Sequence, residues 1–157
     1  RCRLVGSEMC IRDSHYSFYD EFSGTLFMGD TLGLIYPHGD FVQPNLPPPD
    51  FDKEILFKTL DSFEKLEINQ LAIAHFGIHK NARVLIKDAK ESIENWIFFI
   101  SNIENLSNDD ASNELLKWLI RNYESLGIDN ETIKNYIGNG NFVMQIEGIR
   151  NYLRKRS

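Results

Sequence analysis

Two residues with metal-binding side chains each follow an apolar run that is typical of a β-strand. The run Thr25–Met28 is followed by Gly29-Asp30, and the run Leu71–Ala74 is followed by His75. Carboxylate and imidazole groups are common ligands of divalent cations, and a glycine beside a strand lets the backbone pass close to a bound group. If both runs belong to one sheet, Asp30 and His75 converge at one of its ends. We therefore predict that the two side chains lie within about 4–6 Å of each other, the span of one shared metal ion.

Each residue taken alone has a plainer interpretation. A Gly-Asp pair after a strand is commonly a simple turn, and a single histidine at the end of a buried strand is commonly a core histidine with a satisfied hydrogen bond. Tyr36, His38 and Asp40 lie in the segment that follows Asp30 and are candidates for a substrate-binding wall. An exposed loop histidine explains His38 more simply. His79 is expected to be exposed in the loop beyond His75, or to contact the substrate.

The elements that would position the pair follow an α/β pattern. Tyr16–Tyr19 and Thr25–Met28 are β-prone runs separated by turn residues, which predicts a hairpin. Residues 31–45 are rich in Gly, Pro and aromatic residues, which predicts an irregular loop. An amphipathic helix with Asp50 as its N-cap then leads into Leu71–Ala74, an entirely apolar run that predicts a strand buried on both faces.

The remainder of the chain is predicted to be helical. Apolar residues recur at helical spacing from residue 82 to the end, and they are interrupted at helix-capping or helix-ending residues. We expect one long helix over residues 81–103, a second that starts at Ser107 and ends at Gly127, a short one opened by Asp129, and a last one that begins at Asn141. The aromatic stripes on these helices are interpreted as core positions rather than a cofactor site.

Several motifs occur in an order and at a spacing that resemble a known family. They are Ser17-Phe18-Tyr19-Asp20, Ser23-Gly24-Thr25-Leu26-Phe27, Gly29-Asp30, Pro47-Pro48-Pro49-Asp50-Phe51-Asp52 and His75-Phe76-Gly77. Together they are similar to the second half of a metallo-β-lactamase-fold hydrolase, in the broad branch that includes hydroxyacylglutathione hydrolases. The resemblance covers residues 15 to 77 and fades in the helical remainder.

The resemblance implies a fold, a metal site and a reaction. The fold is α/β, the truncated second half of an αββα metallo-β-lactamase sandwich followed by a C-terminal helical region. By analogy Asp30 bridges two metal ions and orients the attacking water, and His75 binds one of the ions. Zinc is the expected cofactor, as one or two ions, and iron and manganese accept the same ligands. The implied substrate is a small molecule with an ester, thioester, amide or phosphoester bond, which water with a metal-lowered pKa hydrolyses.

Other ligands that the family uses do not occur in this sequence. The hallmark His-x-His-x-Asp-His cluster is absent, Ile11 stands where a further metal-binding histidine is usual, and His15 matches a histidine that is generally not a ligand. Because a catalytic zinc takes about three protein ligands, we expect the chain as printed to be an inactive fragment of an active parent.

Residues 1–14 read Arg-Cys-Arg-Leu-Val-Gly-Ser-Glu-Met-Cys-Ile-Arg-Asp-Ser and resemble a translated sequencing-adapter tail. We therefore divide the chain into an artefactual or disordered segment 1–14, an α/β portion 15–80 and a helical region 81–157, and we expect segment 1–14 not to pack against the rest. Both cysteines, Cys2 and Cys10, fall in this segment, so the remainder carries no disulfide or cysteine-based zinc site. That composition is compatible with a cytoplasmic enzyme.

Composition excludes some partners and leaves three functional classes open. The net charge of −6, without a long basic patch, argues against a nucleic-acid partner, and no run reaches the roughly 18 apolar residues of a membrane span. A metallohydrolase is the first interpretation. A di-iron redox enzyme of the same fold is a second, although its flavin-binding partner domain is absent. A non-catalytic self-association module is a third, and a homodimer through the C-terminal helices is compatible with each.

Overall fold

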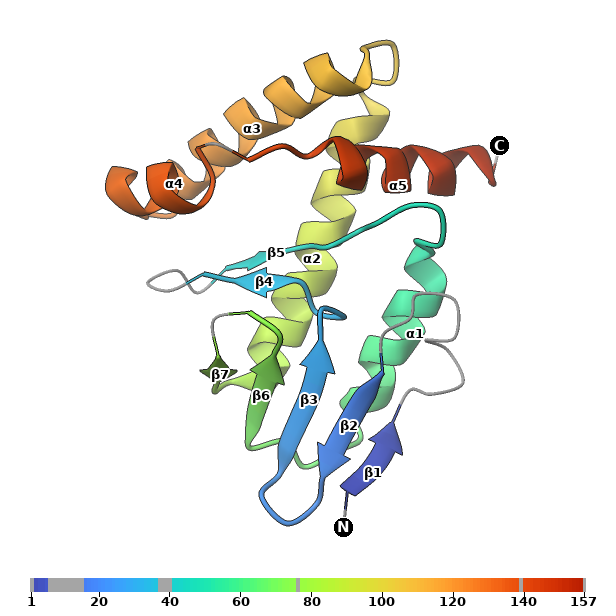
Figure 1. Ribbon diagram of the computed structural model, residues 1–157, viewed down its shortest axis with the longest axis vertical. Coiled ribbons are helices and arrows are strands. Elements are labelled where there is room, and N and C mark those ends of the chain that lie inside the picture. The colour runs from blue at the N-terminus through green and yellow to red at the C-terminus, as the bar shows by residue number, and fades with distance from the viewer. Residues whose placement is uncertain (1, 6–15, 37–40, 76, 139, 157) are drawn as a thin grey trace. The chain divides into compact units, whose positions relative to one another are not determined.

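The first part of the chain forms a mixed five-stranded sheet with helices on one face. The structure is a computed structural model that describes residues 2–5, 16–36, 41–75, 77–138 and 140–156 (Figure 1). Its strands are β1 (Cys2–Val5), β2 (Ser17–Asp20), β3 (Thr25–Gly29), β4 (Leu34–Ile35), β5 (Val42–Gln43), β6 (Gln70–Ile73) and β7 (Ile78–His79). Its helices are α1 (Lys53–Phe63), α2 (Ala82–Ser101), α3 (Asn108–Ser125), α4 (Asn130–Tyr136) and α5 (Val143–Arg154).

The strand order β1-β2-β3-β6-β7 confirms the predicted α/β organisation. Strands β2 and β3 form the expected antiparallel hairpin, with Phe18 opposite Phe27 and Tyr19 opposite Leu26. Strand β6 runs parallel to β3, so the chain between them crosses over through α1. As a result, the carboxyl ends of β3 and β6 lie side by side at one edge of the sheet.

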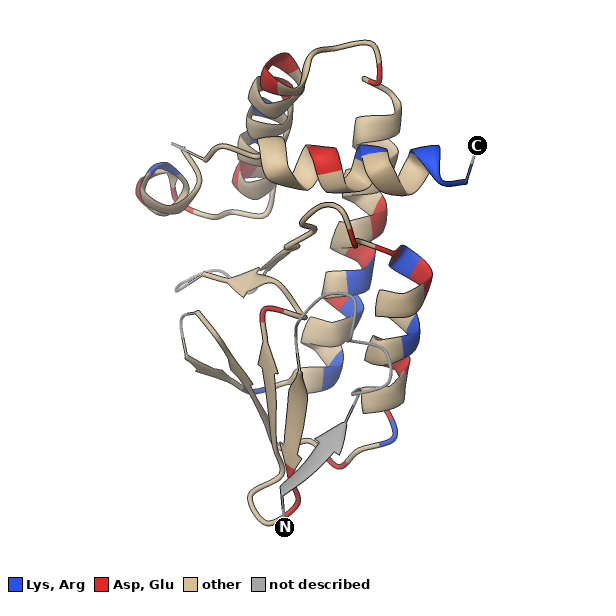
Figure 2. Cartoon of the chain, turned by 45° about the vertical axis from the view of Figure 1, so that its right-hand side comes forward, with Lys and Arg blue, Asp and Glu red and all other residues tan. Residues whose placement is uncertain are grey.

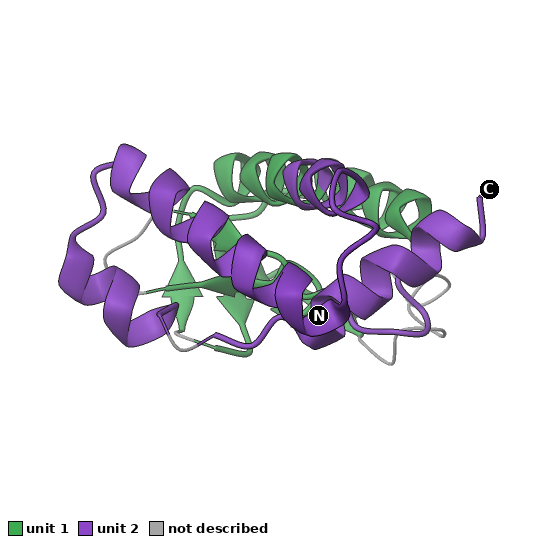
Figure 3. Cartoon of the chain, turned by 90° about the horizontal axis from the view of Figure 1, so that it is seen from above, with its two compact units in different colours: residues 1–45, 52–93 green, residues 46–51, 94–157 purple. Residues whose placement is uncertain are grey.

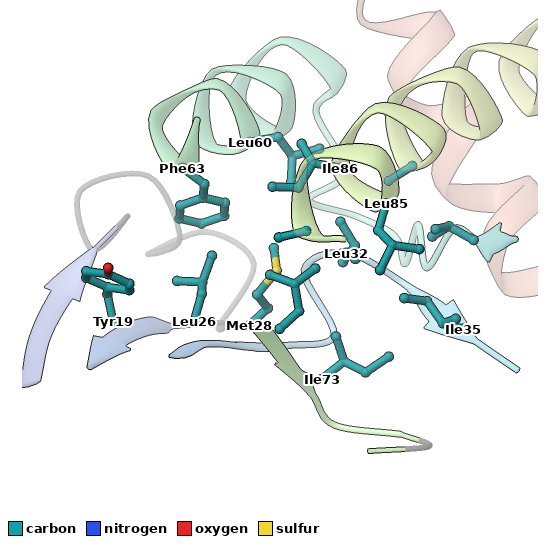
Figure 4. Close-up of a cluster of buried hydrophobic side chains, with 14 residues drawn as sticks. Tyr19, Leu26, Met28, Leu32, Ile35, Leu60, Phe63, Ile73, Leu85 and Ile86 are labelled. Atoms are coloured by element: carbon teal, nitrogen blue, oxygen red, sulfur yellow. The ribbon is translucent and has the colours of Figure 1, made fainter. Parts of the chain in front are cut away.

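One face of this sheet packs against α1 and the first part of α2. Side chains of alternate strand residues point toward the helices, as Figure 4 shows for Leu26, Met28 and Ile73. The core that they build consists of Tyr19, Leu26, Met28, Leu32, Ile35, Val42, Leu60, Phe63, Leu71, Ile73, Ala82, Leu85, Ile86 and Ala89. The prediction that β6 is buried on both faces is wrong, because only Leu71 and Ile73 are buried while Gln70 and Ala72 remain partly exposed.

The helix that crosses between β3 and β6 begins two residues later than predicted. Asp52, and not Asp50, is the N-cap of α1, and its Oδ1 accepts a hydrogen bond of 3.0 Å from the Ile55 amide. Asp52 directly precedes the first helical residue, Lys53, so its side chain reaches an amide of the first turn that has no partner within the helix. Behind α1, Lys90 pairs with Asp61 and Glu64 on the solvent side.

Two segments that were expected to lack regular structure contain short strands. Part of the loop 31–45 forms an antiparallel pair, with Leu34 opposite Gln43 and Ile35 opposite Val42. Within segment 1–14, β1 pairs in register with β2, so the expectation that nothing in this segment packs on the rest is not met at Cys2–Val5. Backbone ladder bonds need no matched side chains, which is why the open edge of β2 can accept such a strand. Residues 6–15 lie outside the described part of the chain.

By its internal contacts the chain forms two compact units, coloured separately in Figure 3. Unit 1 comprises residues 1–45 and 52–93, and unit 2 comprises residues 46–51 and 94–157. The division at residue 80 that the sequence suggested therefore falls within unit 1. Helix α2 contributes its first half to one unit and its second half to the other.

Unit 2 contains most of the helical region that the sequence predicted, and α3 and α4 begin at the expected caps. Helix α5, which was expected to begin at Asn141, has Phe142 as its N-cap without a side-chain capping bond. Ser107 and Asp129 cap α3 and α4, and each accepts a hydrogen bond from the amide three residues on. Gly127, with a φ of 79°, ends α3 through bonds from its amide to the Glu124 carbonyl and from the Ile128 amide to the Tyr123 carbonyl. Among the helices of the described residues, none is long and apolar enough to cross a membrane.

Substitution of Ser107 by alanine tests the α3 cap. Ser107 Oγ accepts from the Asp110 amide at 3.1 Å, and the variant leaves that amide without its acceptor. We expect the free energy of unfolding to fall by about 1 kcal/mol, as for other helix caps. Urea unfolding followed by circular dichroism measures the change, and Ser107→Thr, which keeps the hydroxyl, should lose much less. Equal losses in both variants would contradict the assignment.

Candidate metal site

Asp30 lies at the end of β3 with one carboxylate oxygen withdrawn from solvent. Its Oδ1 is buried and accepts no hydrogen bond from any described residue, although the side chain as a whole is 27% exposed. A buried carboxylate oxygen without a donor loses its hydration without compensation. Such an atom is a candidate site for a cation or a hydrogen-bond donor.

His75 supplies the second polar group at the same edge. Its Nε2 lies 3.5 Å from Asp30 Oδ1, and the side chain is 57% exposed. This distance confirms that the two side chains come together, as their positions after neighbouring strands predicted. The separation is within the range of an ion pair when the imidazole is protonated, although Asp30 Oδ1 accepts no hydrogen bond from the described residues.

Backbone contacts hold the two residues at this separation. The Ala74 amide donates to the Gly29 carbonyl at 3.0 Å, which ties the residue before His75 to the residue before Asp30. The register between β3 and β6 shifts between Phe27 and Gly29, where two steps along β3 match one step along β6, as in a β-bulge. Bulges re-aim a side chain at a strand end, and here the bulge precedes Asp30.

The loop after Asp30 folds back on itself through two short turns. The Thr31 amide donates to the Met28 carbonyl at 3.1 Å, and the Gly33 amide donates to the Asp30 carbonyl at 3.0 Å. Gly33 has a φ of 101°, and a Cβ added there would lie 2.3 Å from the Gln43 carbonyl oxygen. The second glycine of the Gly-Asp motif is therefore required for close passage of β5, as the sequence suggested.

The residue types at this site fit a divalent cation, but their number does not complete one. An imidazole nitrogen and a carboxylate oxygen are typical ligands of zinc, iron and manganese. No group of three or more His, Cys, Asp or Glu side chains in the described part of the chain could hold a metal ion. Asp30 and His75 are thus a pair of candidate ligands rather than a full coordination shell.

The other candidate residues do not join this pair among the described positions. Tyr36 is buried and its ring packs 5.9 Å from that of Phe41, so it forms no exposed substrate wall, and burial raises the pKa of its hydroxyl. His79 belongs to strand β7 and not to a loop, and its Nε2 is buried without a hydrogen-bond partner among the described residues. His15, His38 and Asp40 lie outside the described residues.

One polar group near the pair was not singled out from the sequence. Thr31 follows Asp30 directly, and its Oγ1 is also buried without a hydrogen-bond partner in the described residues. A threonine in a turn carries no signal of its own in the sequence. Two consecutive residues of this turn thus each carry a buried oxygen without a hydrogen-bond partner among the described residues.

Comparison with known proteins identifies the fold. No protein-family model matches the chain, and no curated protein sequence matches it. Among solved structures it is similar to a metallo-β-lactamase family protein from Thermus thermophilus, with a TM-score of 0.58 and 17% identity. The match covers 92% of this chain and 41% of the Thermus chain, so the present chain spans about two fifths of the length of that structure. The fold is therefore that of a metallo-β-lactamase fragment, as the motifs indicated.

Proposed function

We propose that this chain is part of a metal-dependent hydrolase in which Asp30 and His75 are two of the metal ligands. The observation that carries the proposal is the buried Asp30 Oδ1, which accepts no hydrogen bond from the described residues and lies 3.5 Å from His75 Nε2. The likeness to a metallo-β-lactamase family protein supports a hydrolase-type fold around this pair. The remaining ligands come from outside the described residues, since these hold no third ligand at the site.

Asp30 and His75 have different roles at the proposed site. Asp30, held by the turn that follows it, supplies a carboxylate that both attracts a cation and accepts a hydrogen bond from an attacking water. His75, more exposed, supplies an imidazole nitrogen and leaves the rest of the site open to a small-molecule substrate. A bound zinc ion lowers the pKa of water toward neutrality and polarises the bond to be cleaved. The proposed substrates are esters, thioesters and phosphoesters, with zinc as the first choice of metal and iron or manganese as alternatives.

Zinc binding by the 157-residue chain tests the ligand assignment without requiring activity. We expect weak binding, because two ligands fall short of the three that hold a catalytic zinc. Asp30→Asn and His75→Gln should each weaken it by at least about tenfold, a loss at the low end of those seen when metal-site residues are changed. Equilibrium dialysis measures the affinities, and His79→Gln is the matched control.

Two outcomes of this measurement would contradict the proposal. Zinc affinity that is unchanged in both Asp30→Asn and His75→Gln would place the ion elsewhere. Tight stoichiometric zinc, together with turnover of a thioester and a phosphodiester panel by the 157-residue chain, would show that the chain holds a complete site. The same panel offered to a longer chain that contains this sequence should give metal-dependent hydrolysis, which Asp30→Asn abolishes.

A further inference from the structure

Unit 2 contains a cavity of about 420 Å³, lined by residues of the turn after α2, the start of α3 and the second half of α5. The lining residues are Glu104, Asn108, Arg150, Leu153 and Arg154. The volume lies within the range of small-molecule sites, about 300–1,000 Å³. The C-terminal end of α5, which supplies both arginines, is drawn in blue for its basic residues in Figure 2. The cavity thus combines two guanidinium groups with one carboxylate, one amide and one apolar side chain.

Neutral acceptors hold the Arg150 guanidinium in place. Its Nη1 donates to Asn108 Oδ1 at 2.5 Å, and its Nη2 donates to the carbonyl oxygens of Ile103 and Leu106 at 3.1 and 2.9 Å. Asn108 is oriented in turn, because its Nδ2 donates to Glu147 Oε1 at 3.0 Å. These bonds fix the plane of the guanidinium, and a donor that is already fixed loses less conformational entropy when a ligand binds.

The charge of Arg150 has no matching carboxylate in the described part of the chain. No ion pair joins it to a described acidic residue, and its Nε is buried without a hydrogen-bond partner among those residues. Its bonds to the carbonyls after α2 are typical of a cation near a helix C-terminus, but they use only the Nη2 group. Arginine is the side chain best suited to recognise a carboxylate. We infer that this cavity binds a small organic carboxylate, with Arg150 and Arg154 as its cationic partners.

The charges and the apolar surface of the lining select the class of anion. Two arginines and one glutamate give the lining a formal charge of +1, which a monocarboxylate neutralises and a phosphate dianion would reverse. Glu104 thus acts against ligands of higher negative charge by like-charge repulsion. Leu153 offers apolar surface, which favours a ligand with a hydrocarbon part beside its carboxylate. The ligand is therefore a monocarboxylate with a short apolar tail.

Titration of the metal-free 157-residue chain with isovalerate, a branched monocarboxylate, tests this inference. We expect saturable binding in the millimolar range by isothermal titration calorimetry. Isovaleramide, a neutral amide of the same shape, should bind at least about tenfold more weakly, because hydrogen bonds between charged groups are the strong ones. Inorganic phosphate should also bind more weakly than isovalerate. Arg150→Lys keeps the charge but loses the fixed fork, and it should weaken isovalerate binding at least about tenfold.

Arg154→Gln is a second variant at the same cavity, with the same direction of change, for use if Arg150→Lys does not fold. The matched control is Arg121→Gln, which removes one positive charge from an exposed position of α3 outside the cavity lining and should bind isovalerate as the unaltered chain does.

Four results would each overturn the inference. They are no saturable isovalerate binding, isovaleramide or phosphate bound as tightly as isovalerate, an affinity unchanged in folded Arg150→Lys and Arg154→Gln, and an equal loss in Arg121→Gln and Arg154→Gln. Asp30→Asn should leave isovalerate binding unchanged, so this inference and the metal-site proposal can fail separately. A loss of isovalerate binding in Asp30→Asn would instead place the carboxylate at the other site and would also overturn the inference.

Discussion

Replacing Trp96 with alanine is expected to remove about 3–5 kcal/mol from the free energy of unfolding. Trp96 is buried in unit 2, and its ring meets that of Phe142 edge to face with centroids 5.6 Å apart. The Phe142 amide in turn donates to the buried Ser112 Oγ at 2.9 Å, so α3 and the start of α5 are fixed to the same ring pair. The truncation leaves a cavity that these elements cannot fill without breaking that contact.

Phe98 offers a matched control two residues further along α2. It is an aromatic residue on the same helix but is largely exposed, so Phe98→Ala should change the free energy of unfolding by less than about 1 kcal/mol. Urea unfolding followed by far-ultraviolet circular dichroism compares the two variants. A loss below about 1 kcal/mol in Trp96→Ala would show that this ring does not anchor the helical unit.

Replacing Gly148 with alanine is expected to destabilise the chain by about 3 kcal/mol. Gly148 lies in α5, and a Cβ added there would lie 1.9 Å from the Leu46 carbonyl oxygen and 3.2 Å from the Pro47 carbonyl carbon. These neighbours are backbone atoms and cannot rotate away. The helix must therefore move off the segment 46–51, and two nearby contacts with it are lost, between the rings of Phe51 and Tyr152 and from Lys155 Nζ to the Pro49 carbonyl.

The sign of the change in the free energy of unfolding shows whether a packing clash or helix propensity dominates in Gly148→Ala. In an open helical position, alanine is favoured over glycine by about 1 kcal/mol, so a stabilised Gly148→Ala variant would show that α5 does not approach segment 46–51. Met144→Ala, at a half-exposed position of the same helix, is the control and should change stability by less than about 1 kcal/mol. Thermal or urea unfolding of both variants decides between the two outcomes.

The parts of the fold that follow local rules were predictable from the sequence. The hairpin between β2 and β3 follows from two β-prone runs around a turn, and the ends of α3 follow from Ser107 and Gly127. The proximity of Asp30 and His75 also followed, because the carboxyl ends of adjacent parallel strands must meet. The first two predictions used patterns that a few neighbouring residues set, and the third also required the two apolar runs to pair in one sheet.

Other features, which leave no pattern of their own in the sequence, were not predictable. Strands β4 and β7 are two residues long, too short to produce an alternating pattern. Strand β1 pairs with β2 through backbone hydrogen bonds, and such bonds require no recognisable side-chain pattern in the sequence. An apolar run such as Leu71–Ala74 has the same sequence pattern whether one face of the strand is covered or both. The partial exposure of Ala72 is therefore visible only in the structure.

The candidate site was predictable only as far as its two residues. The sequence shows that both are metal-binding residue types and that each follows an apolar, strand-like run. The burial of Asp30 Oδ1 and of Thr31 Oγ1, in contrast, depends on how the turn packs. The described residues place these two candidate ligands at the site and no third beside them.

The most direct test of the metal-site proposal is zinc titration of the 157-residue chain followed by nitrogen-15 NMR of its histidine side chains. We expect the Nε2 resonance of His75 to shift first among the four histidines, and the shift to require at least about ten times more zinc in Asp30→Asn. That result would show that the imidazole and the carboxylate bind one ion together. A His75 resonance that does not respond to zinc, or that responds equally in Asp30→Asn, would contradict a shared metal site at this edge of the sheet.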